Sequence, residues 1–347
     1  KLTSNIFLME VDAKWVARAA KPGQFVIVII DDKGERIPLT ICDYDKEKGT
    51  IVLVFQIVGK STEKMARLGV GDRLKDVVGP LGKESEFMHL DQEEMKNKRF
   101  LFVAGGVGTA PVYPQLKWVK AHGMKADVII GTKTKATLIL EDMIKEYADN
   151  LLVCTDDGSY GMHGVVTDAI KHLVEQKQQK YDEVVAIGPM IMMKFVSLLT
   201  KELGLKTTVS LNSLMVDGTG MCGACRVTIG GKTKFTCVDG PEFDAHLVDF
   251  DEAMRRQAMF KTHEIATDSK DHKCKLTAEV NHTIKRRRVP VREQDAVIRA
   301  TNFDEVCYGY TAEEAMEEAD RCLQCKNPGC KSSWPVSIDI PAFVRQV

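Results

Sequence analysis

Hydrophobic and polar residues follow two different rhythms along the first 210 residues. Up to about residue 95, short runs rich in β-branched and aromatic residues, such as Phe25–Ile30 and Thr50–Val58, are separated by turn-forming Gly and Pro residues. Runs of that length and spacing predict a small antiparallel β-barrel. We therefore assign residues 1–96 to a barrel domain.

From residue 97 onward, apolar runs alternate with stretches of helical period. Four runs are predicted strands: Phe100–Ala104, Ala126–Ile130, Leu151–Thr155 and Glu183–Ile187. Three stretches between them are predicted helices: Val112–Ala121, Leu138–Ala148 and Val165–Gln176. This alternation indicates a parallel sheet with right-handed crossovers, so residues 97–210 are assigned to an α/β domain.

The remaining residues lack this periodicity. Residues 211–275 open with a stretch rich in Gly and Cys, Asp217–Cys225, and are assigned to a cluster-binding domain. Residues 276–347 begin with a basic linker and then become mainly helical. In that segment Thr311 and Glu314 form a predicted capping box at the start of a helix.

Composition narrows the classes of function. The 48 Lys and Arg residues balance 49 Asp and Glu residues, so the chain lacks the basic field of a nucleic-acid binder. No apolar run approaches the ~20 residues that cross a bilayer, and no secretory signal is visible. Ten cysteines without such a signal suggest metal ligands in a reducing cytoplasm. We expect a cytoplasmic protein without nucleic-acid or membrane partners.

A glycine-rich turn connects the first strand of the α/β part to its helix. Its residues are Gly105, Gly106, Gly108, Thr109, Ala110 and Pro111. Glycine lets the backbone approach a pyrophosphate, and the helix N-terminus supplies N–H donors to the anion. The same residues also suit a plain strand–helix turn, and that alternative stays open here.

Two more turns that contain glycine follow later strands of the predicted sheet. They contain Asp156, Asp157, Gly158, Gly188 and Pro189. The carboxyl ends of parallel strands share one edge, where open α/β sheets bind ligands, so these turns favour a dinucleotide site. The carboxylate of Asp156 or Asp157 can bind a ribose diol and would repel a 2′-phosphate, which favours NAD(H). Lys133 and Lys135 leave NADP(H) open as the alternative.

The predicted barrel offers a group of residues suited to a flavin. They are Arg36, Pro38, Leu39, Thr40, Ile41, Gln56, Val58, Gly59, Ser61 and Thr62. Arg36 can donate two hydrogen bonds to a phosphate, and the Thr40 hydroxyl can reach an isoalloxazine edge. The turn from Gly59 to Thr62 is expected to present free N–H groups at a helix start. An exposed arginine and a capped helix on a barrel edge would explain the same pattern.

Four residues have the spacing of a [2Fe–2S] loop. Asp217, Cys222, Cys225 and Cys237 are separated by four, two and eleven residues, with Asp in the first ligand position. The glycines around them leave N–H groups free to point at sulfide. A structural zinc site, or a loop that has lost its cluster, remains an alternative.

Together these motifs resemble the ferredoxin–NADP reductase superfamily. Over about residues 1–275 they are similar to its branch with the dihydroorotate dehydrogenase electron-transfer subunit and the small subunit of NADH-dependent ferredoxin:NADP oxidoreductase. The resemblance implies FAD in the barrel, NAD(H) on the α/β domain and a catalytic role for Thr40 beside the flavin. The loop that begins with Asp217 is similar to that of the oxidoreductase small subunit, whereas dihydroorotate-type subunits normally have Cys there.

The last segment resembles a different family, the N-terminal iron–sulfur segment of the glutamate synthase small subunit and of the large subunit of the same oxidoreductase. The similarity lies in Arg288–Asp295, Asn302–Val306, Gly309–Thr311 and Arg321–Cys330. It implies a [4Fe–4S] cluster held by Cys322, Cys325 and Cys330. The fourth ligand is not identified, since Trp334 stands where the family has Cys, and the resemblance places that ligand beyond residue 347.

These resemblances imply an NAD(H)-dependent iron–sulfur flavoprotein subunit that moves electrons between NAD(H), FAD and a [2Fe–2S] cluster. The implied partners are a second flavoprotein with iron–sulfur clusters and ferredoxin, and electron bifurcation is one mode of such a complex. Other functions stay open: an electron-transfer subunit of dihydroorotate dehydrogenase, an electron-delivery arm for glutamate synthase or sulfur reduction, and a non-catalytic metal-binding module.

Overall fold

The structure is a computed structural model that describes most of the chain. It covers residues 1–32, 34–259, 289–302, 304–319, 322, 340–344 and 346. The chain forms two compact units, Lys1–Asp271 and His272–Val347, and each is considered by itself. Cys325 and Cys330 lie outside the described residues. Within those residues, no helix has the length and apolar character needed to cross a membrane.

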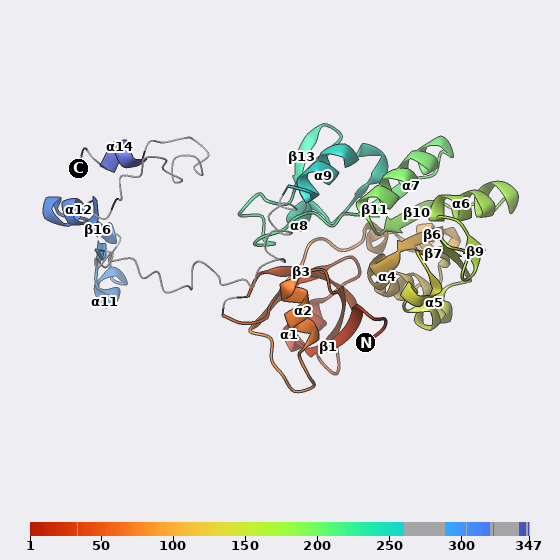
Figure 1. Ribbon diagram of the computed structural model, residues 1–347, viewed down its shortest axis with the longest axis horizontal. Coiled ribbons are helices and arrows are strands. Elements are labelled where there is room, and N and C mark those ends of the chain that lie inside the picture. Colours follow the sequence, from red (N-terminus) through yellow and green to blue (C-terminus); the bar gives the residue numbers. More distant parts are fainter. Residues whose placement is uncertain are drawn as a thin grey trace. The chain divides into compact units, whose positions relative to one another are not determined.

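The first part of the larger unit lies at the red end of the colour bar in Figure 1. It contains a five-stranded antiparallel sheet in the order β1-β4-β3-β2-β5. Its strands are β1 (Ile6–Asp12), β2 (Phe25–Ile29), β3 (Ile37–Asp45), β4 (Thr50–Gln56) and β5 (Asp76–Leu81). Two helices, α1 (Lys14–Ala19) and α2 (Lys60–Ala66), complete its apolar core. The antiparallel sheet is as predicted. Among the described strands β1 and β5 are the edges of the ladder, so barrel closure stays a prediction.

The second part is built on a seven-stranded sheet in the order β14-β11-β10-β6-β7-β8-β9. Its parallel strands are β6 (Arg99–Gly105), β7 (Lys125–Thr132), β8 (Asn150–Thr155), β9 (Met162–His163), β10 (Glu183–Ile187) and β11 (Thr207–Ser210). The helices are α3 (Gln92–Asn97), α4 (Thr109–Ala121), α5 (Glu141–Tyr147), α6 (Val166–Lys171) and α7 (Met190–Glu202). The predicted β–α alternation is confirmed. The third predicted helix continues beyond α6 as a π-helical turn, His172–Gln176.

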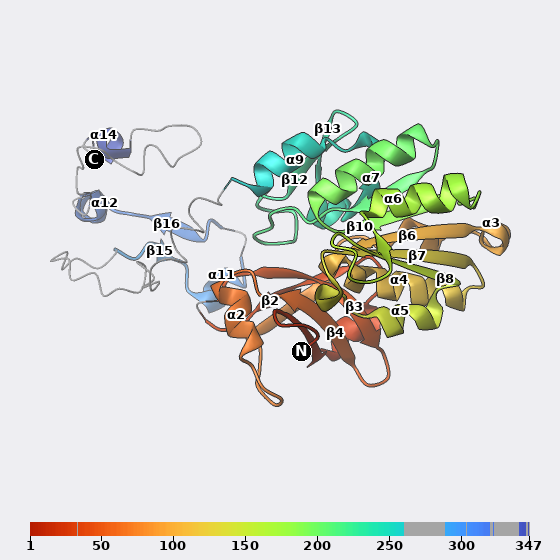
Figure 2. The same cartoon turned by 45° about the vertical axis from the view of Figure 1, so that its right-hand side comes forward.

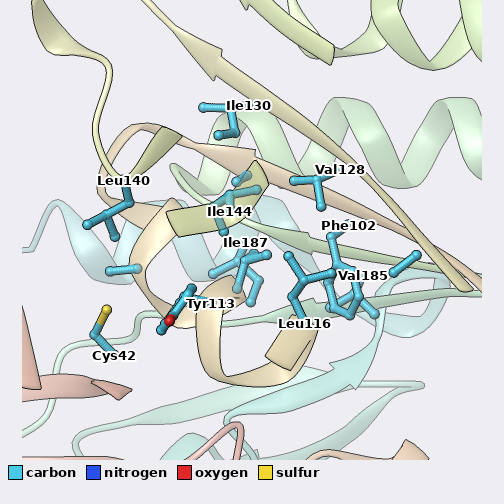
Figure 3. Packing of buried hydrophobic residues seen from close by; sticks show 14 of the residues in the cluster. Cys42, Phe102, Tyr113, Leu116, Val128, Ile130, Leu140, Ile144, Val185 and Ile187 are labelled. Atoms are coloured by element: carbon cyan, nitrogen blue, oxygen red, sulfur yellow. The ribbon is translucent and has the colours of Figure 1, made fainter. Parts of the chain in front are cut away.

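Alternate residues of the parallel strands face opposite sides of the sheet. Phe102 and Val185 pack in one buried cluster with Tyr113 and Leu116 of α4 (Figure 3). A second buried cluster joins the other face to α6, α7 and α9 (Phe250–Gln257). Figure 2 shows α6 and α7 on one side of the sheet and α4 and α5 on the other. This layered packing brings the carboxyl ends of the strands to one open edge.

The third part of the larger unit shares the sheet of the second. Its strand β14 (Glu242–Asp244) pairs antiparallel with β11, which ends at Ser210. A hairpin of β12 (Arg226–Ile229) and β13 (Lys232–Phe235) leads into α8 (Thr236–Asp239). The predicted boundary after residue 210 therefore falls inside one continuous sheet, because a strand from beyond it forms the sheet edge.

The smaller unit is described in short pieces. They are β15 (Arg292–Glu293), α11 (Ala296–Arg299), β16 (Cys307–Gly309), α12 (Ala312–Ala319) and α14 (Ile340–Val344). The predicted capping box is confirmed: the Thr311 N–H donates to Glu314 Oε2 at 2.7 Å, and the Glu314 N–H donates to Thr311 Oγ1 at 3.2 Å. The Cys322 N–H donates to the carbonyl of Ala319 at 3.0 Å, so this candidate ligand directly follows α12.

Glu242 of β14 lies where the three parts of the larger unit meet. Its Oε1 accepts hydrogen bonds from Ser85 Oγ at 2.9 Å and from Gln115 Nε2 at 2.7 Å. Both of these partners are fully buried. Burial raises the pKa of Glu242 to about 7, and the negative charges of Glu183 and Glu86 add to the rise. The protonated form is therefore favoured by folding.

We expect this carboxyl to make stability depend on pH. Because its folded pKa lies above the ordinary 4.5, its contribution is fully present below pH 4.5 and is lost as the pH rises to about 7. The loss amounts to at most about 3 kcal/mol. Glu242→Gln should flatten the fall in unfolding free energy between pH 5 and pH 8, whereas Glu202→Gln, at an exposed glutamate at the end of α7, should retain it. An equally steep fall in Glu242→Gln would refute this assignment.

Candidate functional site

The flavin candidates on β3 lie on a half-exposed strand beside β2. Thr40 pairs with Phe25, and Leu39 pairs with Val26. Thr40, Leu39 and Pro38 are partly exposed, so a ligand can reach them. Ile41 differs, since its side chain is 2% exposed and belongs to the core of the first part.

Backbone N–H groups in the turn after β4 already have hydrogen-bond partners, which the sequence did not indicate. Thr62 Oγ1 accepts hydrogen bonds from the N–H groups of Val58 at 3.0 Å and Gly59 at 3.1 Å. The prediction of a free N–H at Gly59 is therefore wrong, because the buried Thr62 hydroxyl caps the turn. The Ser61 hydroxyl bonds to Glu35. Gln56 is partly exposed and Val58 is exposed, and binding by either stays a prediction.

The glycine turns after β6 and β10 meet at one point of the sheet edge. These strands are neighbours in the sheet, and their following helices α4 and α7 cover opposite faces. A Cβ on Gly188 would lie 3.0 Å from the Cα of Gly105. Open α/β sheets bind nucleotides at such a switch point, so this edge is the candidate nucleotide site.

The glycines of this edge have different roles. A Cβ on Gly108 would lie 2.2 Å from the carbonyl oxygen of Ile187, and one on Gly105 would lie 2.4 Å from Met192 Sδ. Gly108 is thus required for close packing against backbone, whereas the contact at Gly105 is with side-chain atoms. Gly106 has a positive φ of 55° and open space where a side chain would point, so it leaves backbone accessible to a ligand.

Among the other candidates in the turns after β6 and β10, some are buried and one is exposed. Thr109, Ala110 and Pro111 are buried, and the Thr109 hydroxyl donates to the carbonyl of Gly106 at 2.9 Å. Pro189 is exposed. Met192 is partly exposed beside Gly105 and Gly188.

The turn after β8 is tied to the turn after β7. The N–H of Asp156 donates to the carbonyl of Thr132 at 3.1 Å, and the N–H of Lys135 donates to Ser159 Oγ at 2.8 Å. Asp157 is exposed, and hydrogen bonds from Ser159 lower its pKa. The turn is completed by the exposed Gly158. Carboxylates and lysines thus share this edge, and the choice between NAD(H) and NADP(H) stays open in the geometry.

The first two candidate cluster ligands form a pair. Cys222 Sγ lies 3.3 Å from Asp217 Oδ1. The carboxylate of Asp217 also accepts the N–H groups of Thr219, Met221 and Cys222 at 3.0 to 3.1 Å. Although desolvation opposes it, these hydrogen bonds lower the pKa of Asp217 to about 2. The side chain is therefore a carboxylate that organises its own loop.

The other two candidates form a second, buried pair. Cys225 Sγ lies 3.2 Å from Cys237 Sγ, and both residues are at most 2% exposed. Burial and the neighbouring Cys225 raise the pKa of Cys237 to about 12, and a backbone hydrogen bond from Gly220 opposes the rise. Gly220 belongs to the loop that joins Asp217 to Cys222. The two pairs are thus adjacent.

The separations within the two pairs are compatible with metal ligation. In a tetrahedral site with metal–sulfur bonds of about 2.3 Å and metal–oxygen bonds of about 2.0 Å, ligand atoms lie roughly 3.5 Å apart, close to the separation within each pair. In a [2Fe–2S] cluster each iron takes two protein ligands. Within the described part of the chain, no group of three or more His, Cys, Asp or Glu side chains could hold one metal ion.

The cluster loop packs directly on the first sheet. Cys225 and Cys237 belong to a small hydrophobic core that also contains Phe25 and Ile27 of β2. A Cβ on Gly218, which has a φ of 77°, would lie 2.8 Å from Ile27 Cγ1. Phe25 is the register partner of Thr40. The candidate flavin strand and the buried ligand pair are therefore separated by a single strand.

Two arginines bind the loop from outside, and sequence reasoning missed both contacts. Arg36 Nε and Nη2 donate to the carbonyls of Val216 at 3.0 Å and Asp217 at 2.9 Å. Arg256 of α9 donates to the carbonyl of Ala224 at 2.9 Å. The sequence gives no signal for either contact, because the bonded carbonyls lie 180 and 181 residues from Arg36 and 32 residues from Arg256 along the chain.

Two family models match the chain. Residues 212–249 match the iron–sulfur cluster binding domain of dihydroorotate dehydrogenase B. Residues 299–347 match dihydropyrimidine dehydrogenase domain II, 4Fe-4S cluster. The second match includes Cys322, Cys325 and Cys330. Iron–sulfur sites are therefore supported in both units.

Curated relatives and a solved structure resemble the larger part of the chain. An uncharacterized protein in the adh 3′ region of Clostridium beijerinckii is 62% identical over 76% of this chain and 89% of its own length. A dihydroorotate dehydrogenase B electron transfer subunit homolog of Thermotoga maritima is 47% identical over 76% and 90%. The dihydroorotate dehydrogenase B (NAD(+)) electron transfer subunit of Fusobacterium nucleatum is 31% identical over 72% and 95%.

The structural similarity agrees with these relatives. A chain of the NADH-dependent reduced ferredoxin-NADP oxidoreductase, solved in work on flavin-based electron bifurcation, has a TM-score of 0.70 and 45% identity. The similarity covers 77% of this chain and 93% of that one. It confirms a ferredoxin reductase-like flavoprotein fold with an antiparallel and a parallel sheet. The chain is thus an iron–sulfur oxidoreductase subunit that belongs to the family of the dihydroorotate dehydrogenase B electron transfer subunits and their homologues.

Proposed function

We propose that this chain is the NADH-oxidising electron-transfer subunit of a ferredoxin:NADP⁺ oxidoreductase complex and holds FAD, NAD(H) and a [2Fe–2S] cluster. The observation that carries the proposal is the pairing of Asp217 with Cys222 and of Cys225 with Cys237 beside the first sheet. The 45% identity to a chain of the NADH-dependent oxidoreductase supports the same activity.

NAD(H) is proposed to bind along the edge where β6 and β10 meet. Gly106 offers open backbone to the pyrophosphate, and the 13-residue helix α4 directs its N-terminus to the same turn. Asp156 and Asp157 lie farther along this edge, where their carboxylates can accept hydrogen bonds from a ribose diol. Their negative charge opposes a 2′-phosphate, which supports NAD(H) over NADP(H).

FAD is proposed to lie along β3, with its ring beside Thr40 and its phosphates near Arg36. A flavin held there would supply hydride acceptance from nicotinamide and single-electron transfer to an iron–sulfur centre. The partly exposed Thr40 hydroxyl is proposed to donate a hydrogen bond to the flavin ring, which makes Thr40 the catalytic residue of this scheme. Its register partner Phe25 packs with Cys225 and Cys237, so the route to the cluster is short.

The outward ligand pair is proposed to face the partner protein. Cys222 is exposed, and around it Met221, Val216 and Val238 are 89%, 52% and 40% exposed. An exposed apolar rim of this kind is typical of a protein interface. The proposed partner is a second flavoprotein with iron–sulfur clusters, similar to the glutamate synthase small subunit. Ferredoxin and NADP⁺ react with the complex, and we propose that it splits electron pairs.

A second cluster, of the [4Fe–4S] type, is proposed in the smaller unit. Cys322, Cys325 and Cys330 are its candidate ligands, and the match of residues 299–347 to a 4Fe-4S family model supports them. The fourth ligand of this cluster is not identified.

Dihydroorotate dehydrogenase activity is the second candidate function, favoured by the names of two relatives that are 47% and 31% identical. The two candidates differ in the partner subunit and in the first cluster ligand. A dihydroorotate-type complex would contain an FMN-binding subunit that oxidises dihydroorotate, and its loop would normally begin with Cys rather than Asp217. Purifying the native complex and assaying dihydroorotate oxidation against NADH-dependent reactions separates the two.

Rapid mixing of the anaerobic protein with NADH tests the proposed route. In the wild type we expect bleaching of the flavin absorbance, followed by the EPR signal of a reduced [2Fe–2S] cluster. In Cys225→Ser the flavin should bleach at an unchanged rate, while that EPR signal is lost, because Cys225 is a buried ligand on the sheet side. Cys42→Ser, at a buried cysteine outside the loop, is the matched control. A normal EPR signal of the [2Fe–2S] cluster in Cys225→Ser would contradict the proposed transfer of electrons from the flavin to this cluster.

A further inference from the structure

Arg36 connects the candidate flavin strand to the cluster loop. It directly precedes β3, which carries Thr40, and its guanidinium reaches two carbonyls that lie 180 and 181 residues later in the chain. Those carbonyls belong to Val216 and to Asp217, the first candidate cluster ligand. One side chain thus contacts the segment proposed to hold FAD and the segment proposed to hold iron.

The geometry of this contact restrains the loop. A planar guanidinium that donates through Nε and Nη2 fixes the orientation of two successive carbonyls, which a single-point donor such as Lys cannot do. On the following residue, Gly218 packs against Ile27 from the sheet side. The backbone around Asp217 is therefore held from two directions, and the carboxylate is presented toward Cys222.

The charge of Arg36 is also available to the cluster. Among the residues that the structure describes, its guanidinium forms no ion pair with a carboxylate. A cation close to an iron–sulfur centre stabilises the reduced, more negative form and raises the reduction potential. Two of the five guanidinium N–H groups bind the loop, so the others remain for a flavin phosphate.

We propose that Arg36 is a positioning residue for the two-iron centre: it holds the peptide of Asp217 in the ligand orientation and raises the cluster potential. This role is separate from the flavin-phosphate contact suggested by its motif, and it rests on the proposed function. Because the bonds to Val216 and Asp217 need no flavin, the role should persist in protein stripped of FAD.

The test uses the full chain, isolated anaerobically and freed of FAD, in three forms. Arg36→Met removes both hydrogen bonds and the charge, and Arg36→Lys keeps the charge alone. Arg67→Met alters an exposed arginine of the same sheet domain that forms an ion pair with Glu63. The measurements are the rate of cluster loss to an iron chelator and the cluster potential by EPR-monitored redox titration.

We expect both Arg36 variants to lose the cluster about tenfold faster than wild type, since one hydrogen bond to a charged donor is worth at least that factor. The potential should fall in Arg36→Met and stay near wild type in Arg36→Lys, while Arg67→Met matches wild type in both measurements. A phosphate-binding role alone predicts no change without FAD, so wild-type behaviour of Arg36→Met would overturn this inference. Absence of any two-iron signal in the wild type would instead overturn the proposed function, and this inference with it.

Discussion

Gly108→Ala is expected to destabilise the chain by about 2–3 kcal/mol and to abolish saturable NADH binding. The new Cβ would lie 2.2 Å from the carbonyl oxygen of Ile187 and 2.9 Å from the Cα of Gly188. Both are backbone atoms at the end of β10, so relief requires the ends of β6 and β10 to separate. The unfolding free energy from a denaturant titration and the NADH dependence of flavin reduction measure the two effects.

Gly106→Ala is the matched control for this prediction. Its Cβ would point into open space, so the cost comes only from its φ of 55° and should be about 1–2 kcal/mol. The variant should remain folded, with weaker NADH binding, because the methyl group stands where the backbone is proposed to approach the pyrophosphate. If Gly108→Ala proved no less stable than Gly106→Ala, the packing role of Gly108 would be wrong.

Asp217→Ala is expected to eliminate the [2Fe–2S] cluster. The substitution removes one proposed ligand and also the acceptor of the N–H groups of Thr219, Met221 and Cys222, so the loop loses its organising anion. The protein should lose the two irons of this centre and the corresponding EPR signal, while its flavin content stays unchanged. Iron analysis and EPR spectroscopy of the anaerobic protein measure this outcome.

Asp217→Cys provides the contrast. Thiolate is a softer and more strongly donating ligand than carboxylate, so the cluster should be retained with a potential lowered by roughly tens of millivolts. An unchanged potential and an unchanged spectrum in this variant would show that the carboxylate does not touch iron. Retention of the full cluster in Asp217→Ala would lead to the same conclusion.

Much of the fold follows from local patterns. The predicted strand Glu183–Ile187 coincides with β10, since continuous apolar runs of that length bounded by turn residues suit a strand buried on both faces. The capping box of Thr311 and Glu314 depends on residues three apart, and it is present. The pairing of β14 with β11 was not predicted, because a three-residue strand leaves no periodic signal and its partner is set by tertiary packing.

Part of the arrangement around the candidate ligands follows from sequence spacing. Asp217 and Cys222 are five residues apart and lie side by side, whereas Cys225 and Cys237 are brought together by the β12–β13 hairpin. Iron binding by these four residues stays a prediction. The glycines could not be separated by sequence into those with open space beside them, such as Gly106, and those required for packing, such as Gly108. The contact of Arg36 with Asp217 was also out of reach, since it depends on how two distant segments pack.

The most direct test of the central claim is the flavin, iron and sulfide content of the anaerobically isolated protein, with its EPR spectrum after NADH reduction. The account predicts bound FAD and a [2Fe–2S] signal that survives replacement of Cys322 and disappears on replacement of Cys237. Protein without flavin, zinc in place of iron, or a two-iron signal independent of Cys237 would contradict it.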